Sequence, residues 1–172
     1  AQRGMGLSVM RAMELNRRSL REAKSRGDKP ILYCGIGTDA LPDGVPATLD
    51  QIVDAYLQQA EMIEAEGGRV VIMASRALVR AAKGPDDYAY VYDRVIAKLS
   101  QPTIIHWLGE MFDPALQGYW GAADHYEAMD VCLDVLTRHA PKIAGVKLSL
   151  LDREKEIALR ARLPAGVAMF TG

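Results

Sequence analysis

The chain alternates short apolar runs with longer segments of helical period. Five of the runs have the length of β-strands, and they span residues 30–35, 69–74, 103–107, 143–148 and 166–171. Each run is almost continuously apolar, which is typical of strands in a parallel sheet that is covered on both faces. The alternation of such strands with helices predicts repeated βα units.

Helical patterns occupy the segments between these runs. Thr48 and Gln51 form a capping box before an apolar stripe that ends at residues 67–68, and Pro85 with two following aspartates indicates another helix start. Further helices are expected over residues 8–26, from about 124 to 139, and from 152 to 164.

The order of these elements predicts an α/β fold with the units of a (β/α) barrel. A complete barrel has eight strands and about 250 residues, so five strands cannot close one. We therefore interpret residues 1–172 as a single domain that is an incomplete barrel. An open doubly wound sheet is the structural alternative. It would break the sequential order of the strands, because its chain reverses direction at a switch point, whereas barrel strands follow one another in order.

Composition argues against several kinds of partner. The 172 residues include 21 basic and 22 acidic side chains, so no overall field would attract nucleic acid or an anionic membrane. No apolar stretch reaches the roughly 18 to 20 residues of a membrane span, and the first residues do not resemble a secretion signal. Cys34 and Cys132 form no metal pattern and fit reduced thiols. We expect a cytoplasmic protein with neither nucleic-acid nor membrane partners.

Lys147 is the most distinctive polar residue within the apolar runs. It lies between Val146 and Leu148, where a charged amine is costly to bury without a partner. Burial favours the neutral amine, which is the form that attacks a carbonyl group to give a Schiff base. The alternative is a lysine that reaches solvent from the strand end or pairs with Asp39 or Asp152.

Other polar residues also follow the predicted strands, at the edge where reactive groups of parallel α/β folds gather. His106 is either an acid–base group or a buried core histidine. Together with Asp39, Glu110 and Asp113 it offers metal-binding atoms, although this spacing fits no standard motif and solvated loop carboxylates are the alternative. The turn at residues 35–40 is either an anion-binding nest or an ordinary βα turn.

Aromatic side chains gather around the loop after the third predicted strand. They line an apolar pocket or pack against a neighbouring subunit, and packing is the favoured interpretation. The residues are Trp107, Phe112, Tyr119 and Trp120.

Several segments resemble one enzyme superfamily. Residues 102–172 contain PTIIHWLGEMFDPAL, IAGVKLSLLD and GVAMFTG, and they resemble the later barrel units of dihydrodipicolinate synthase and N-acetylneuraminate lyase. In that superfamily a G-[IV]-K strand supplies the Schiff-base lysine, and Gly145-Val146-Lys147 matches it. Upstream, ILYCGIGTDA and RVVIMAS resemble the third and fourth strands. The resemblance implies a (β/α)8 TIM barrel of which this chain covers roughly strands 3 to 7.

The chain also departs from the pattern of that superfamily. His106 stands where a catalytic tyrosine is usual, residues 109–111 where an arginine often binds the substrate carboxylate, and residues 75–77 where the fourth-strand loop has a tyrosine. The first two strands, their Thr-Thr-Gly substrate loop and the last strand have no counterpart in the chain. The match therefore favours a dihydrodipicolinate-synthase-like branch and does not predict diaminopimelate-pathway chemistry.

The resemblance implies a class I aldolase or lyase that uses no cofactor and no metal. Lys147 would form an imine with a 2-oxo acid or a sugar-like carbonyl substrate, and His106 would transfer a proton. The alternatives are a metal-assisted barrel enzyme and a non-catalytic small-molecule-binding barrel. We also expect a homo-oligomer. The residues expected to bind substrate are Gly37, Thr38, Ser75, Ser149, Thr171 and Gly172.

Overall fold

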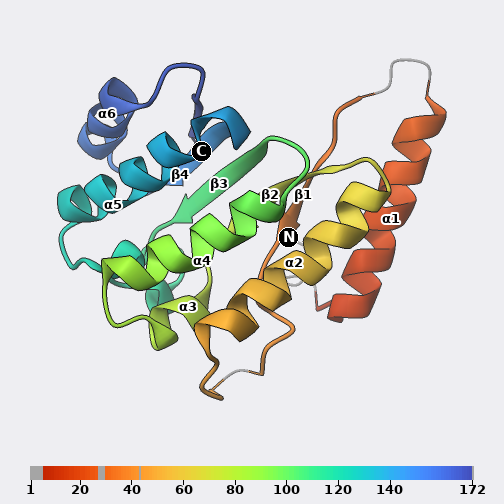
Figure 1. The fold of residues 1–172 in the computed structure, drawn as a ribbon, viewed down its shortest axis with the longest axis horizontal. Coiled ribbons are helices and arrows are strands. Elements are labelled where there is room, and N and C mark those ends of the chain that lie inside the picture. The colour runs from red at the N-terminus through yellow and green to blue at the C-terminus, as the bar shows by residue number, and fades with distance from the viewer. Residues whose placement is uncertain (1–5, 27–29, 43, 172) are drawn as a thin grey trace.

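The computed structural model describes residues 6–26, 30–42 and 44–171, and its centre is a parallel sheet (Figure 1). The strands are β1 (Tyr33–Ile36), β2 (Arg69–Met73), β3 (Thr103–Leu108), β4 (Ile143–Ser149) and β5 (Ala168–Thr171). They lie side by side in sequence order, and each neighbouring pair is parallel. All five predicted strands and their predicted order are confirmed. The order contradicts the open doubly wound alternative.

The helices that were predicted are all present. They are α1 (Val9–Ser25), α2 (Leu49–Ala65), α4 (Pro85–Lys98), α5 (His125–Arg138) and α6 (Arg153–Arg162). The structure adds α3 (Arg76–Ala81) and the short 3-10 helices η2 (Pro114–Leu116), η3 (Tyr119–Gly121) and η4 (Ala140–Lys142), which were not predicted. Within the described parts of the chain, no helix has the length and apolar character needed to cross a membrane.

The ends of the predicted helices are fixed by side-chain caps. Thr48 accepts a hydrogen bond from the backbone of Gln51, whose side chain returns one, so the predicted capping box is confirmed. Asp124 and Asp152 cap α5 and α6 in the same position of the helix, each accepting two backbone N–H groups.

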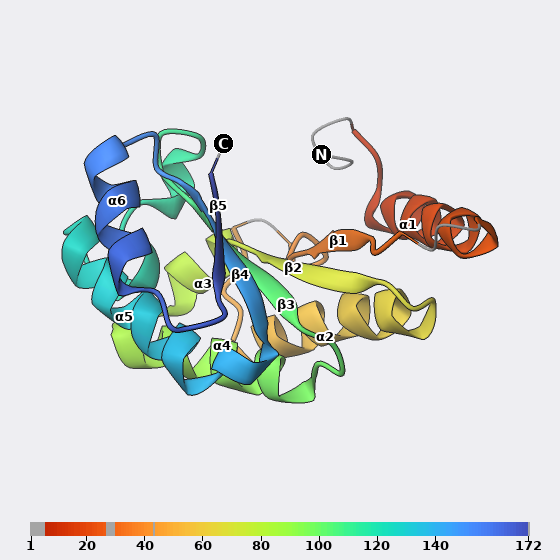
Figure 2. The same ribbon diagram turned by 90° about the horizontal axis from the view of Figure 1, so that it is seen from above.

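The helices cover one face of the sheet. In Figure 2, α2, α4 and α5 run along the same side of the strands, while α1 lies beyond the edge formed by β1. Alternate strand residues point toward these helices and are fully buried, and they include Ile72, Ile105, Val146 and Leu148. The hydrophobic core therefore lies between the sheet and its outer helices, as in a barrel.

The aromatic cluster belongs to this core. Trp107, Tyr119 and Trp120 are buried. Tyr119 and Trp120 form edge-to-face or stacked contacts with tyrosines of α4, and Trp107 meets Trp120 edge to face. The prediction that these three residues line a pocket or contact another subunit is therefore wrong, because they pack inside their own chain. Phe112, in contrast, is 51% exposed. The predicted thiols, Cys34 and Cys132, are both buried and unpaired with each other.

The opposite face of the sheet is concave, and apolar side chains surround the few polar ones on it. It carries Val71, Met73, Ile104 and Phe170, which are partly buried or exposed. No helix covers this face within the described residues, so the prediction of strands covered on both sides holds for the outer face alone. The inner face is the one that would surround the axis of a closed barrel.

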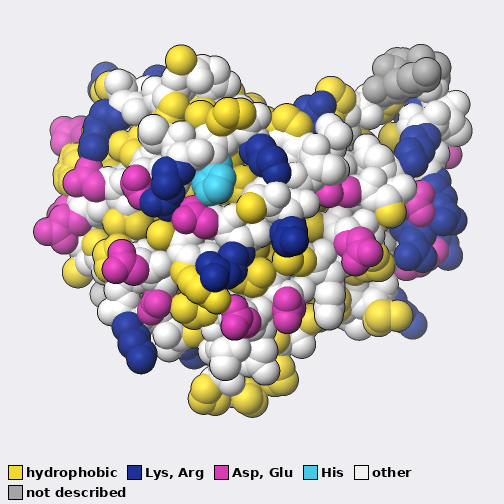
Figure 3. Space-filling view, viewed as in Figure 1, with side chains coloured by type: hydrophobic (Ala, Val, Ile, Leu, Met, Phe, Trp, Pro, Cys, Tyr) yellow, Lys and Arg dark blue, Asp and Glu magenta, His cyan; other side chains and the backbone are white. Residues whose placement is uncertain are grey.

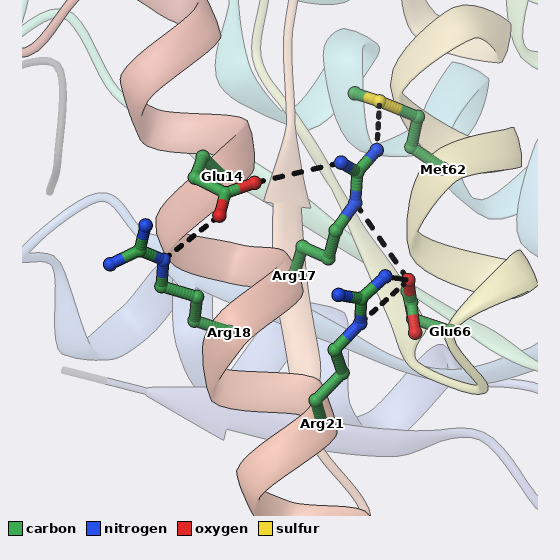
Figure 4. A network of polar contacts seen from close by, with 6 residues as sticks. All are labelled: Glu14, Arg17, Arg18, Arg21, Met62 and Glu66. Carbon is green, nitrogen blue, oxygen red and sulfur yellow. Dashed lines mark hydrogen bonds and ion pairs between the residues drawn. The ribbon is translucent and has the colours of Figure 1, made fainter.

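α1 is attached to the end of α2 by ion pairs, and its buried Met13 and Leu20 belong to the hydrophobic core. Glu66 accepts hydrogen bonds from Arg21 and lies 3.7 Å from Arg17, while Glu14 pairs with both Arg17 and Arg18 (Figure 4). The arginines and Glu14 are 41–76% exposed, although Glu66 is only 18% exposed, so each of these pairs contributes little by itself. Lys and Arg side chains accordingly gather at the end of the molecule formed by α1, whereas both signs of charge are mixed elsewhere on the visible face (Figure 3).

Candidate active site

Lys147 and His106 lie next to each other on the concave face. The Cα atoms of the two residues are partners in the parallel ladder between β3 and β4. Register partners in a sheet direct their side chains to the same face. Trp107 and Leu148, which follow them, point to the outer face and are buried there. The two residues to which the sequence analysis gave chemical roles are therefore neighbours on one face of the sheet.

Both side chains line one cavity of about 630 Å3. Its floor is the inner face of the sheet, and α1 forms one wall with Ala12, Met13 and Asn16. The cavity extends past the ends of β1 and β2 to Gly37 and Asp39. A small carbonyl compound in this space could contact the amine and the imidazole together.

His106 is held in its neutral form. The residue is only 6% exposed, and burial, followed by the nearby positive charge of Lys147, lowers its pKa from 6.5 to about 4. Its Nε2 atom lies 3.1 Å from the Oγ atom of Ser149, with which it forms a hydrogen bond. A neutral imidazole has one nitrogen that accepts and one that donates, so His106 is able to accept a proton at neutral pH.

Lys147 is partly buried, and the carboxylates that were considered as its partners do not bind it. Asp152 caps α6 and pairs with Lys155 at 3.0 Å. Asp39 lines the same cavity, but among the described residues Lys147 forms no ion pair with it or with any other carboxylate. The alternative interpretation of Lys147 as one member of a structural ion pair is therefore not supported.

Gly145 leaves the space that Phe170 occupies beside Lys147. A Cβ atom on Gly145 would lie 2.6 Å from the carbonyl oxygen of Ala168 and 2.6 Å from Cε2 of Phe170. Phe170 is also the register partner of Lys147 on β5. The glycine of the G-V-K segment thus has a packing role, since it allows β5 to approach β4 with the aromatic ring on the inner face.

Replacing Gly145 by alanine is expected to destabilise the protein by about 1–3 kcal/mol, because backbone atoms of β5 must move. Urea unfolding of the full-length protein measures this loss. Gly35→Ala is the control, since its Cβ would meet only the flexible Met73 side chain, at 3.3 Å. Equal stability of the two variants would contradict the packing role of Gly145.

The turn after β1 is held by a side chain that the sequence did not single out. Gln59 of α2 accepts a hydrogen bond from the N–H of Gly37 at 3.2 Å and donates one to its carbonyl oxygen at 2.5 Å. The Gly37 N–H is therefore engaged, which disfavours the anion-binding nest proposed for this turn. The next residue, Thr38, is bonded through its hydroxyl to Ser75 at 2.6 Å.

Several residues expected to bind substrate lie away from the cavity of Lys147. Ser75 is 1% exposed and caps α3 by accepting a hydrogen bond from the N–H of Leu78. It lines neither this cavity nor the smaller one beside it. Thr171 is the register partner of Leu148, so it belongs to the outer face of the sheet and not to the face of Lys147. Gly172 lies outside the described residues.

A second cavity, of about 340 Å3, continues the first one toward the carboxyl ends of the strands. The two share Gly37, Asp39, Met73 and Ala74 in their linings. The second cavity adds Thr38 from the β1 turn and, from the unpredicted helix α3, Arg76 and Arg80. Of the residues expected to bind substrate, Gly37 and Thr38 are therefore beside open space.

The residues considered for a metal centre are not brought together. Asp113 pairs with Arg76 at 2.6 Å, and Glu110 pairs with His125 at 3.2 Å. Among the residues that the structure describes, no three His, Cys, Asp or Glu side chains are close enough to bind one ion. The geometry does not support the metal-assisted alternative.

Five parallel strands in sequence order, outer helices and a lysine on the inner face define a segment of a (β/α)8 barrel. The chain belongs to the family described as "Protein of unknown function (DUF993)", whose model matches residues 1–172. No curated protein matches the sequence.

Solved structures with a similar fold include a dihydrodipicolinate synthase, a putative dihydrodipicolinate synthetase and an aldolase. The synthase from Oceanobacillus iheyensis has a TM-score of 0.64 and 16% identity, covering 96% of this chain and 44% of that one. The putative dihydrodipicolinate synthetase from Pseudomonas aeruginosa has a TM-score of 0.65 and 15% identity, and the match covers 99% of this chain and 49% of that one. The 2-keto 3-deoxygluconate aldolase from Picrophilus torridus has a TM-score of 0.59 and 12% identity, and the match covers 93% of this chain and 48% of that one.

The chain thus spans less than half the length of these structures. At this level of identity the likeness concerns the fold. The resemblance found in the sequence is confirmed at that level, and so is the barrel architecture of which the chain is a part.

Proposed function

We propose that this chain carries the imine-forming part of a class I aldolase or lyase that acts on a 2-oxo acid or a sugar-like carbonyl substrate. The observation that carries the proposal is the pairing of Lys147 with the neutral His106 in register on the inner face of the sheet, where both line one cavity. The names of the solved structures with this fold agree with such chemistry.

The residues would divide the reaction between them. The Lys147 amine attacks the carbonyl carbon of the substrate, a C–N bond forms, and the carbonyl oxygen leaves as water, which yields the imine. The protonated imine withdraws electrons from the neighbouring carbon, so that a proton or a carbon fragment can be lost from it. His106 accepts that proton and later returns it, because it is neutral and lies beside the amine.

Borohydride trapping tests the proposal on the full-length protein. Pyruvate, the smallest probe of the 2-oxo acid class, is expected to become covalently attached when sodium borohydride is added, since reduction converts the imine to a stable secondary amine. Peptide mass spectrometry should locate the adduct on Lys147. 2-Keto-3-deoxygluconate serves as the sugar-like probe in a parallel sample.

The control for trapping is a second lysine near the same strand. Lys142 donates hydrogen bonds to the carbonyl oxygens of Ala97 and Leu99 at the end of α4, so it has a structural role. No adduct is expected there. Absence of any adduct with both probes, or an adduct distributed over surface lysines, would contradict the proposed function.

A further inference from the structure

Ser149 contacts His106 and not the cavity. Its hydroxyl oxygen lies 3.1 Å from Nε2 of His106, and the two residues are 2% and 6% exposed. His106 and Lys147 line the 630 Å3 cavity, whereas Ser149 is not part of its lining. The serine therefore contacts the proton-transfer group without lining the cavity that contains the amine of Lys147.

The ladder between β3 and β4 fixes this contact. Ser149 is two residues after Lys147, so the alternation of side chains along β4 places it on the same inner face. Its Cα partner is Leu108, and its carbonyl oxygen accepts a hydrogen bond of 3.0 Å from the N–H of Gly109. The imidazole of His106 is thus directed diagonally across the two strands, toward a hydroxyl that the backbone holds in place.

The hydrogen-bond partner of one imidazole nitrogen determines whether the other nitrogen carries a proton. A neutral histidine protonates either Nδ1 or Nε2, and a hydrogen bond at one nitrogen selects the tautomer and the orientation of the ring. Loss of that bond would leave the ring without a fixed orientation. The nitrogen that faces the substrate would then accept a proton in only part of the molecules.

We propose that Ser149 is a positioning residue, which fixes the ring orientation and the tautomer of His106 so that one defined nitrogen faces the cavity beside Lys147. This role rests on the proposed function of the two residues and assigns to Ser149 a task other than binding substrate. It depends on the hydroxyl group, because alanine at this position would keep the strand but remove the oxygen atom to which Nε2 of His106 is hydrogen-bonded.

The test combines spectroscopy with kinetics on the full-length protein. Nitrogen-15 NMR of labelled histidines reports the tautomer of His106, with His106→Gln used to assign its signals. One tautomer is expected to dominate in the natural protein, and Ser149→Ala is expected to give a mixture. The exchange of pyruvate methyl hydrogens with deuterium should slow by about tenfold in kcat with little change in KM, as loss of one hydrogen bond allows.

Two further variants separate positioning from packing. Ser149→Thr keeps the hydroxyl and is expected to restore both the tautomer and the rate. Thr103→Val removes another buried hydroxyl, which donates to the carbonyl oxygen of Val70 at the other end of β3, and it should change neither. An unchanged tautomer in Ser149→Ala, or an equal rate loss in Thr103→Val, would overturn the proposal.

The outcomes for Ser149 and for the proposed function are distinguishable. Borohydride should still attach pyruvate to Lys147 in Ser149→Ala, because the amine is untouched. If the natural protein forms no adduct while the tautomer still depends on Ser149, the imine chemistry fails, and what stands is that Ser149 fixes the tautomer of His106. If the adduct forms and the tautomer does not respond to Ser149→Ala, the positioning role fails alone.

Discussion

Lys147→Ala in the full-length protein is expected to abolish the exchange of pyruvate methyl hydrogens with deuterium while the fold remains intact. Without the amine no imine forms, so the electron-withdrawing group that makes the methyl hydrogens acidic is lost. The fold should persist because Lys147 is partly buried at a cavity and holds no carboxylate partner among the described residues. Proton NMR follows the exchange, and thermal unfolding by circular dichroism checks the fold.

Two lysine variants make this result specific. Lys147→Arg keeps the positive charge but lacks a primary amine, so it should be as inactive as the alanine variant. Lys142→Ala should retain exchange and lose stability, because Lys142 binds carbonyl groups at the end of α4. Normal exchange by Lys147→Arg would show that the residue acts through its charge alone, and the imine mechanism would be wrong.

His106→Phe is expected to reduce the exchange rate on the order of a hundredfold or more, as is usual when a proton-transfer group is removed. Phenylalanine preserves the ring and its packing but has no nitrogen to accept a proton. The adduct with pyruvate should still form under borohydride, more slowly. A variant that loses stability and keeps its rate would instead show that His106 is a core residue.

The pH dependence of His106 follows from its pKa of about 4 in the folded protein. Above pH 6.5 the ring is neutral in both the folded and the unfolded protein, so its titration does not change the free energy of unfolding in that range. Between pH 6.5 and 4 only the unfolded chain binds the proton, and the free energy of unfolding falls as pH falls, by roughly 3 kcal/mol in total. Urea unfolding at pH 7 and pH 4.5 should therefore show a smaller drop for His106→Phe than for the natural protein.

Activity has the same acid limit. As far as His106 determines it, the exchange rate should stay constant from neutral pH to about pH 5 and decline near pH 4, where the ring is protonated. A decline centred near pH 6.5 would mean that the ring is not buried as described.

The strands and the long helices could be predicted because burial leaves a periodic record in the sequence. Continuous apolar runs marked the strands, and caps such as Thr48 and Gln51 marked a helix start. α3 was not predicted, because its six residues are too few to show an apolar stripe of helical period. Its cap, Ser75, carried a hydroxyl at a strand end and was therefore interpreted as a substrate ligand.

The site was predictable where it depends on strand alternation alone. Lys147 and His106 were identified because they are polar residues within apolar runs. The alternation of side chains along β4 also places Gly145 and Ser149 on the face of Lys147. The contact between His106 and Ser149 depends in addition on the register of two strands, which the sequence does not specify. The two hydrogen bonds between Gln59 and Gly37 could not be predicted from the sequence, because a glutamine on a helix is normally solvated.

The strand order has a practical consequence for work on this segment. β1 and β5 are the outer strands of the sheet, and one side of each has no strand partner within the described residues. The N–H and C=O groups along such an edge can pair with a strand of another molecule. A fragment limited to this chain is thus prone to associate through its two edges, and its assembly in solution would report edge pairing instead of the natural quaternary structure.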